Sequence, residues 1–355
     1  MRDTVRLLAA TALAGVISCF VTFGRLPTLP LAGARHQKGI DAGYQTGYQK
    51  DFDARYQRGI ALNFYWRQGM RVPQVIAAEA VYARSLGANA VSLSFPLYVH
   101  GSTAAAGPAT PTPAMVGQAV SAAQSAGLAV YLRPLLDQGN LPNYRVWWTP
   151  TSLARWFDTY QAFLLPYARV AQSAGADGFY VGTEFTEFGH SPYWAALDAA
   201  VRRVYHGRLY YSANWQEALT NQAAAIGGDP VRLAIDAYPQ MPVPPAGLRA
   251  SWAAWARHLP KGTVLSEVGI TPRAGAQYAP YNVWSDAPLT PQEQPAWYAA
   301  ACNAVLAHHL GGIFFWTINV GQPLDVAQPQ TDYSFVASPG AEAIKGCFSR
   351  LARLT

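Results

Sequence analysis

Short runs of aliphatic, β-branched and aromatic residues alternate along the chain with longer amphipathic stretches, and this alternation repeats eight times. Short apolar runs bounded by turn residues are typical of buried strands, whereas apolar positions spaced three and four residues apart are typical of helices. The predicted strands are Gly59–Trp66, Ala90–Tyr98, Ala129–Leu136, Gly178–Phe185, Arg208–Trp215, Leu233–Pro239, Thr263–Ile270 and Gly312–Asn319.

Amphipathic stretches connect these strands, and several of them end near glycine, which is common just past the last turn of a helix. The connection 216–229, between the fifth and sixth strands, has the weakest helical pattern. The predicted helices are Val72–Leu86, Pro113–Ala126, Ser152–Ser173, Pro192–His206, Gly247–His258 and Gln292–His309, followed by a last helix that contains Cys347.

This order of elements predicts the α/β class and a (β/α)8 TIM barrel. The strands are nearly continuous apolar runs, as expected for parallel strands that are covered on both faces. An open doubly wound sheet is the competing architecture, and it usually carries a glycine-rich phosphate turn after its first strand. Here the first strand leads instead into Asn63-Phe64-Tyr65-Trp66, so the barrel is favoured.

Three regions are expected along the chain. Residues 1–24 contain Arg2, Arg6 and an apolar run from Leu7 to Phe23, which is typical of a signal sequence or a short membrane anchor. Cys19 follows Val-Ile-Ser, as in a bacterial lipoprotein cleavage box, so lipidation of Cys19 is one expected outcome. Residues 25–58 are expected to be a tether and entry segment, and residues 59–355 the catalytic barrel. The protein is therefore predicted to be exported, to the periplasm or the cell exterior, with anchoring to a membrane left open.

Composition narrows the range of ligands. The formal net charge is +6, but lysines and arginines are scattered singly and form no stripe for phosphates, so a nucleic-acid partner is not expected. Aromatic residues make up 13% of the chain, enough to leave rings for flat, partly apolar ligands such as sugars. Cys302 and Cys347 lie in the last two predicted helices, where an oxidising compartment would permit a disulfide. No cysteine spacing suits zinc, and no metal or other cofactor is expected.

Two carboxylates stand out among the polar residues at the carboxyl ends of the predicted strands, where active sites of such barrels lie. Glu184 ends the fourth strand within Val-Gly-Thr-Glu-Phe, and Glu267 ends the seventh within Val-Leu-Ser-Glu-Val-Gly. Such a pair could cleave a glycosidic bond with retention, one carboxylate attacking the sugar while the other protonates the leaving oxygen. Alternatively, each glutamate makes only a structural ion pair inside the barrel.

The eight strands, with Gly-x-Glu ending the fourth and Ser-Glu-x-Gly ending the seventh, resemble clan A of the glycoside hydrolases. Within the clan the chain is most similar to glycoside hydrolase family 113, whose described members are β-mannanases. The resemblance covers roughly residues 59–319 and implies that Glu184 is the acid/base and Glu267 the nucleophile. It also implies that Tyr238 hydrogen-bonds the nucleophile and that Trp316 forms the aromatic floor beneath the reacting sugar.

One position departs from the clan pattern. Members usually carry Asn directly before the acid/base, where its amide contacts the sugar 2-hydroxyl, but this chain has Thr183. A threonine hydroxyl reaches less far and offers one donor where an amide offers two. Asn214 or Asn63 could supply the missing amide, and the departure makes mannan a less certain substrate.

Three further residues are expected to bind substrate. Arg133 could bind a sugar hydroxyl or keep a carboxylate ionised, although an arginine inside a barrel often only balances buried acids. Trp66 and Trp215 follow the ends of the first and fifth strands, where an indole ring could stack on a pyranose. For each tryptophan, packing in the core is an equally good interpretation.

The leading hypothesis is a retaining glycosidase that acts on a β-linked polysaccharide or oligosaccharide and needs no cofactor. Two alternatives remain: a non-catalytic carbohydrate-binding protein on the same fold, and a transglycosylase with the same catalytic residues. Other enzyme classes lack support, because the chain contains no Gly-x-Ser-x-Gly elbow, no His-Glu-x-x-His helix and no Walker loop.

Overall fold

The computed structural model describes residues 56–139, 141–217, 231–326 and 332–354. The expected leader, Cys19 and nearly all of the expected tether lie outside the described residues, as does most of the connection 216–229. Within the described residues, no helix is both long and apolar enough to cross a membrane.

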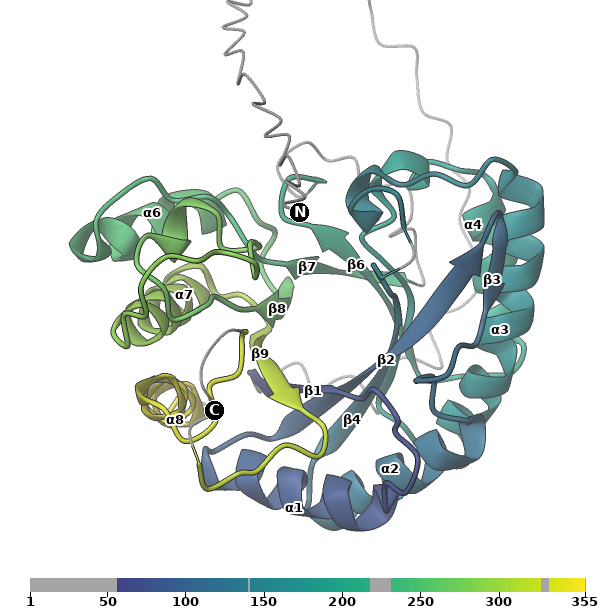
Figure 1. Ribbon diagram of the computed structural model, residues 1–355, viewed down its shortest axis with the longest axis horizontal. Helices are drawn as coiled ribbons and strands as arrows, with labels where there is room; N and C mark the ends of the chain where they lie inside the picture. Colours follow the sequence, from purple (N-terminus) through teal and green to yellow (C-terminus); the bar gives the residue numbers. More distant parts are fainter. Residues whose placement is uncertain (1–55, 140, 218–230, 327–331, 355) are drawn as a thin grey trace, which may run out of the picture. The chain divides into compact units, whose positions relative to one another are not determined.

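Eight parallel strands close into a barrel, which confirms the predicted fold (Figure 1). Neighbours pair in the order β1-β9-β8-β7-β6-β5-β4-β2, and a β1–β2 pairing closes the ring. The barrel strands are β1 (Gln57–Asn63), β2 (Ala90–His100), β4 (Ala129–Leu136), β5 (Gly178–Thr183), β6 (Arg208–Asn214), β7 (Val231–Asp236), β8 (Val264–Val268) and β9 (Gly312–Asn319).

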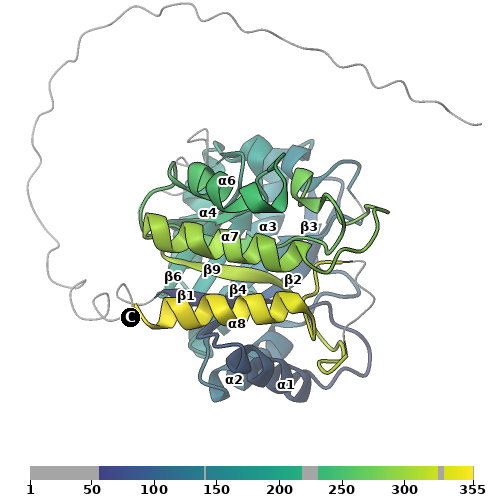
Figure 2. The same ribbon diagram turned by 90° about the vertical axis from the view of Figure 1, so that its left-hand side faces the viewer.

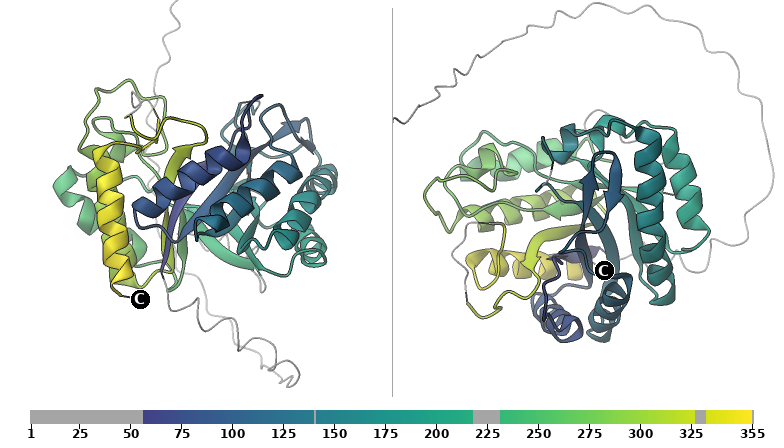
Figure 3. Two further views of the ribbon diagram at one scale, coloured as in Figure 1. Left: turned by 90° about the horizontal axis from the view of Figure 1, so that it is seen from below. Right: turned by 45° about the vertical axis from the view of Figure 1, so that its right-hand side comes forward.

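Helices surround the barrel and cover its outer face, as the views in Figures 2 and 3 show. α3 begins at a serine cap, because the Ser152 hydroxyl accepts a hydrogen bond from the Arg155 amide. The described helices of nine residues or more are α1 (Val72–Ser85), α2 (Pro113–Ser125), α3 (Leu153–Ser173), α4 (Tyr193–Arg202), α6 (Leu248–Ala256), α7 (Glu293–His308) and α8 (Pro339–Ala352).

Side chains that alternate along the strands fill the barrel interior in layers. An aromatic cluster lies near the amino ends of the strands, where Tyr131 packs edge to face against Tyr210 and Phe314, and Tyr180 stacks on Tyr210 at 5.2 Å. Two positions further along, β4 presents Arg133 and β6 presents Ser212, and both are buried. The aromatic layer therefore closes one end of the barrel and leaves the carboxyl ends of the strands for a site.

Two of the differences from the predicted boundaries concern the ends of β1 and β2. β1 ends at Asn63 and not at Trp66, because the Trp66 amide leaves the barrel ladder and donates to the Ala109 carbonyl at 2.8 Å. β2 continues to His100 and turns back into β3 (Thr103–Ala105), an antiparallel partner that the alternation of strands and helices did not predict.

A disulfide joins Cys302 in α7 to Cys347 in α8, with the two Cα atoms 5.8 Å apart. Both cysteines are fully buried. The bond links the last two helices of the ring, across 45 residues of chain that include β9.

Candidate active site

Glu267 lies at the carboxyl end of β8, where both of its oxygens accept hydrogen bonds. Arg133 donates to Oε2 at 2.6 Å and the Tyr238 hydroxyl donates to Oε1 at 2.5 Å. The register of β8 against β9 shifts between Leu265 and Val268, and Ser266 and Glu267 both face partners inside the barrel. Glu267 is therefore held by two donors, one of them a cation.

Glu184 lies directly after β5 and adopts a left-handed backbone conformation with φ of 55°. Such a conformation costs a non-glycine residue about 1–3 kcal/mol and persists where its surroundings hold it. Here the Glu184 amide donates to the Ser212 carbonyl at 2.8 Å, and the next amide, of Phe185, donates to the Tyr211 hydroxyl at 2.9 Å. β6 thus fixes the backbone on both sides of the carboxylate.

Both oxygens of Glu184 also accept hydrogen bonds. The Asn214 side-chain amide donates to Oε1, and Arg145 Nε donates to Oε2, each at 2.8 Å. Asn214 is itself fixed, because its backbone amide donates to Glu217 at 2.7 Å. The Arg145 Nη1 atom donates to the Leu136 carbonyl at 3.0 Å. The carboxylate is 2% exposed, so these two partners replace the water that it has lost.

A polar layer lies beneath the two glutamates. Arg133 is fully buried and makes a second ion pair, with Asp236. The hydroxyls of Ser212 and Ser266 donate to the other Asp236 oxygen at 2.6 and 3.0 Å. Burial raises the pKa of Asp236, and Arg133 acts against that rise. Arg133 thus bridges Asp236 and Glu267 and holds the position of the glutamate from below.

The two glutamates belong to one electrostatic cluster. Although burial acts to lower the pKa of Arg145, Glu184 and Glu267 both act to raise it, and the net shift is upward. Both glutamates also act to raise the pKa of Asp236. Each glutamate therefore does make an ion pair, as the alternative of purely structural glutamates requires. Both ion pairs, however, lie at one barrel mouth and not at separate places in the core.

Two tyrosines on loops complete the cluster. Burial, helped by Tyr144, Glu267 and Glu184, raises the pKa of Tyr333 well above its usual value, so its hydroxyl stays protonated. That hydroxyl donates to the Pro280 carbonyl at 3.1 Å, and its ring lies 5.8 Å from the ring of Tyr238. Burial also raises the pKa of Tyr144, with Glu184 as the next cause.

The remaining predicted residues lie around this cluster at different depths. Trp316 is 8% exposed, and its ring centroid lies 6.0 Å from the Arg133 guanidinium carbon. Thr183 is buried, and its hydroxyl has no hydrogen-bond partner within the described residues. Trp66 and Trp215 are half-buried and pack partly against the core. Asn63 donates to Asn319 Oδ1 at 3.0 Å.

Sequence reasoning did not single out Arg145, Tyr144 or Tyr333 as site residues. All three lie on loops, where no periodicity indicates which side chain turns inward. Asp236 was visible at a strand end, but its partnership with Arg133 depends on neighbours 103 residues apart in the chain. Among the described residues, no group of three or more histidines, cysteines and carboxylates could hold a metal ion.

Comparison with known proteins places the chain among carbohydrate-active enzymes. The sequence profile of glycoside hydrolase family 113 matches residues 102–337, well over half of the chain. A search of curated proteins finds no significant match.

Several solved structures share the fold. One is the family 113 β-mannanase of Alicyclobacillus acidocaldarius in complex with ManMIm, at 22% identity and a TM-score of 0.69, covering 84% of this chain and 99% of that one. A family 113 β-1,4-mannanase complex has 17% identity and a TM-score of 0.71, covering 83% and 99%. A family 5 subfamily 18 protein of Streptomyces cattleya in complex with GlcNAc has 16% identity and a TM-score of 0.57, covering 85% and 82%.

Proposed function

Because the chain belongs to glycoside hydrolase family 113 and is a glycosidase, we propose that it hydrolyses β-1,4-linked mannan-type chains with retention of configuration. The observation that carries the proposal is the pair Glu184 and Glu267, which project from β5 and β8 into one cluster at the carboxyl ends of the strands. A retaining mechanism requires two such carboxyl groups on either side of the scissile bond.

Glu267 is the nucleophile in this proposal. Hydrogen bonds from Arg133 and Tyr238 fix its two oxygens, so that one lone pair can be directed at the anomeric carbon. As the bond from Glu267 to that carbon forms, the bond from the carbon to the leaving oxygen breaks. The products of this step are a glycosyl-enzyme ester and a released sugar.

Glu184 is the acid/base. It gives its proton to the leaving oxygen in the first step and takes a proton from water in the second, when the ester is hydrolysed and Glu267 is released. Asn214 and Arg145 donate to its two oxygens and hold the side chain in place. The first step requires one of these oxygens to carry a proton.

Aromatic side chains offer sugar-stacking surfaces around the two carboxylates. We assign Trp316, beside Arg133, to the floor under the reacting sugar. Trp147 on the loop after β4 and Trp284 on the loop after β8 are 60% and 74% exposed, and they suit sugars further along the chain. Thr183 takes the place of the usual amide, and its hydroxyl is buried without a hydrogen-bond partner within the described residues.

The test is hydrolysis of β-1,4-mannan and mannooligosaccharides by wild type, Glu184→Gln and Glu267→Gln. Both variants are expected to fold and to lose at least about a thousandfold in kcat. Tyr278→Phe, at a half-exposed position, is a control that should retain full activity. A wild-type protein that binds these sugars without cleaving them would favour the non-catalytic alternative. A product that is mainly longer oligosaccharides would favour the transglycosylase.

We further propose that the protein is exported. The apolar run at residues 7–23 motivates this proposal, and the buried Cys302–Cys347 disulfide supports it, because disulfides persist in oxidising compartments. Lipidation at Cys19 would hold the protein on a membrane. Mass spectrometry of the native protein, with Cys19→Ser as the comparison, tests it: a lipid mass lost in the variant supports lipidation, and an unmodified mature chain refutes it.

A further inference from the structure

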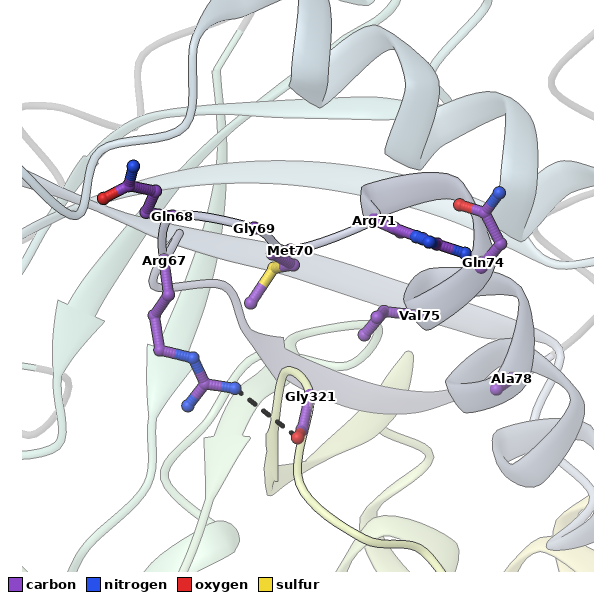
Figure 4. A pocket seen from close by; sticks show the side chains of 9 residues that line it. All are labelled: Arg67, Gln68, Gly69, Met70, Arg71, Gln74, Val75, Ala78 and Gly321. Carbon is purple, nitrogen blue, oxygen red and sulfur yellow. Dashed lines mark hydrogen bonds between the residues drawn. The ribbon is translucent and has the colours of Figure 1, made fainter.

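A pocket of about 570 Å³ lies beside the barrel mouth, between the β1–α1 loop and the loop that follows β9. In Figure 4, Arg67 extends toward Gly321 on the far loop, and Arg71 and Gln74 lie at the other end, where α1 begins. Met70 provides an apolar surface between them. The pocket thus combines guanidinium and amide donors with an apolar patch.

The positive charge in this pocket has no carboxylate partner within the described residues. Arg67 donates only to the carbonyls of Val320 and Gly321, at 3.4 Å each, and Arg71 has no ion pair or side-chain hydrogen bond there. Arg67 acts electrostatically on the buried Glu79. Burial raises the pKa of Glu79 to about 8, so at neutral pH this carboxyl is mostly uncharged and leaves the arginines uncompensated.

The start of α1 adds to the positive field. No side chain caps the helix at Arg71, and its first turn contains no acidic residue. The free amides at a helix amino end carry partial positive charge. Two guanidinium groups and one side of the first turns of α1 line the same pocket, with no negative group among its lining residues.

The pocket adjoins the proposed site along the seam between β1 and β9. Asn63 at the end of β1 bonds Asn319 at the end of β9, and the Val320 amide donates to the Asn63 carbonyl at 3.1 Å. Arg67 is four residues beyond Asn63, a reach of at most about 14 Å. A polysaccharide that passes over Trp316 can therefore extend into the pocket within a few sugar units.

We propose that this pocket is a subsite for a carboxylate carried by the polysaccharide, so that the enzyme prefers chains with uronic acid residues to wholly neutral ones. The proposal rests on the proposed function and specifies its substrate class. An arginine matches the two oxygens of a carboxylate with parallel donors, which a neutral hydroxymethyl group cannot accept in the same way. Gln68 and Gln74 supply amides for the neighbouring hydroxyls.

The experiment compares two pentasaccharides of the same β-1,4 linkage, mannopentaose and penta-mannuronate, by calorimetric titration at pH 7 and low salt. All proteins carry Glu267→Gln so that neither ligand is consumed. The pocket variant is Arg67→Gln with Arg71→Gln. The matched control is Arg169→Gln with Arg249→Gln, which removes the same charge from exposed positions on α3 and α6.

The protein that carries Glu267→Gln alone, with Arg67 and Arg71 intact, should bind penta-mannuronate at least about tenfold more tightly than mannopentaose, as charge-assisted hydrogen bonds predict. The pocket variant should lose that preference while its Kd for mannopentaose changes less than about twofold, and the control should keep the preference. Equal Kd values for the two sugars in the protein with Arg67 and Arg71 intact would overturn the proposal. So would a preference that survives in the pocket variant or disappears in the control.

The proposed function and the proposed subsite can be tested separately. Hydrolysis of neutral β-1,4-mannan by wild type tests the glycosidase alone. Cleavage of mannan without any carboxylate preference removes the subsite and keeps the enzyme. A carboxylate preference that depends on Arg67 and Arg71, in a protein that cleaves neither sugar, keeps the subsite and removes the proposed reaction.

Discussion

Arg145 Nε donates a hydrogen bond to Glu184 Oε2 at 2.8 Å, so the proposed acid/base is ion-paired with a residue from a loop and not from a barrel strand. The loop is fixed at this point, because Gln138 accepts a hydrogen bond from the Arg145 amide at 3.0 Å. The pair positions the Glu184 carboxylate, which takes a proton from water in the second step of the proposed reaction. It does nothing for the first step, in which Glu184 must carry a proton.

Replacing Arg145 should therefore slow hydrolysis of the glycosyl-enzyme more than its formation. Arg145→Met is expected to lower kcat on an aryl β-mannoside with a good leaving group by about ten- to a hundredfold, with a burst of released phenol. Stopped-flow absorbance measures both phases. Arg169→Met, on the exposed face of α3, is the control. A change in KM alone, with unchanged kcat and no burst, would contradict this role.

Tyr238 is expected to act by positioning Glu267. Tyr238→Phe removes the hydroxyl that donates to Glu267 Oε1 and leaves the ring in place. Because a hydrogen bond to a charged group is involved, kcat should fall by about tenfold or more with little change in KM. Steady-state kinetics on mannooligosaccharides tests this, with Tyr278→Phe as the comparison. A variant with wild-type kcat would remove Tyr238 from the machinery.

The disulfide should contribute to stability and not to catalysis. Cys302 and Cys347 lie in outer helices, and the bond closes a loop of 45 residues. The double variant Cys302→Ala with Cys347→Ala should lower the free energy of unfolding by about 2–4 kcal/mol, because the unfolded chain gains conformational freedom. Denaturant titration with parallel kinetics tests this. An unchanged unfolding midpoint, or a folded variant with altered kcat, would count against it.

Glu79 gives the pH dependence of stability a definite sign. Its pKa rises from 4.5 to about 8 on burial, so the folded protein holds a proton that the unfolded chain releases. This contribution to stability is fully present below about pH 4.5 and is lost as the pH rises through 8. Glu79→Gln keeps an oxygen for the Gly321 amide, which donates to Glu79 at 2.6 Å.

Urea titrations of wild type and Glu79→Gln at pH 5 and pH 8 measure the effect. The variant should lose less stability than wild type between the two pH values. The stability of the variant should still depend on pH to some extent, because burial also raises the pKa of Asp198 and Glu217, each to about 7. Parallel curves for the two proteins would show that Glu79 does not titrate in this range.

The barrel could be predicted from the sequence because each of its eight parallel strands is an apolar run and the helices between them have their own period. Glu184 and Glu267 were visible for the same reason, as charges that end apolar strands. The extra hairpin of β2 and β3 was missed, because a three-residue strand leaves no periodic signal. Arg145 and Tyr333 were missed because a loop residue reaches the site through tertiary contacts alone. Arg133 was visible, but only the structure shows that it spans Asp236 and Glu267.

The most direct test of the two-carboxylate account is the configuration of the first product. Proton NMR of wild-type enzyme acting on β-1,4-mannohexaose resolves the anomeric protons before mutarotation mixes them. The account predicts that the β-anomer appears first and that the α-anomer follows only at the rate of mutarotation. Initial release of the α-anomer would show inversion, and Glu267 could then not be the nucleophile.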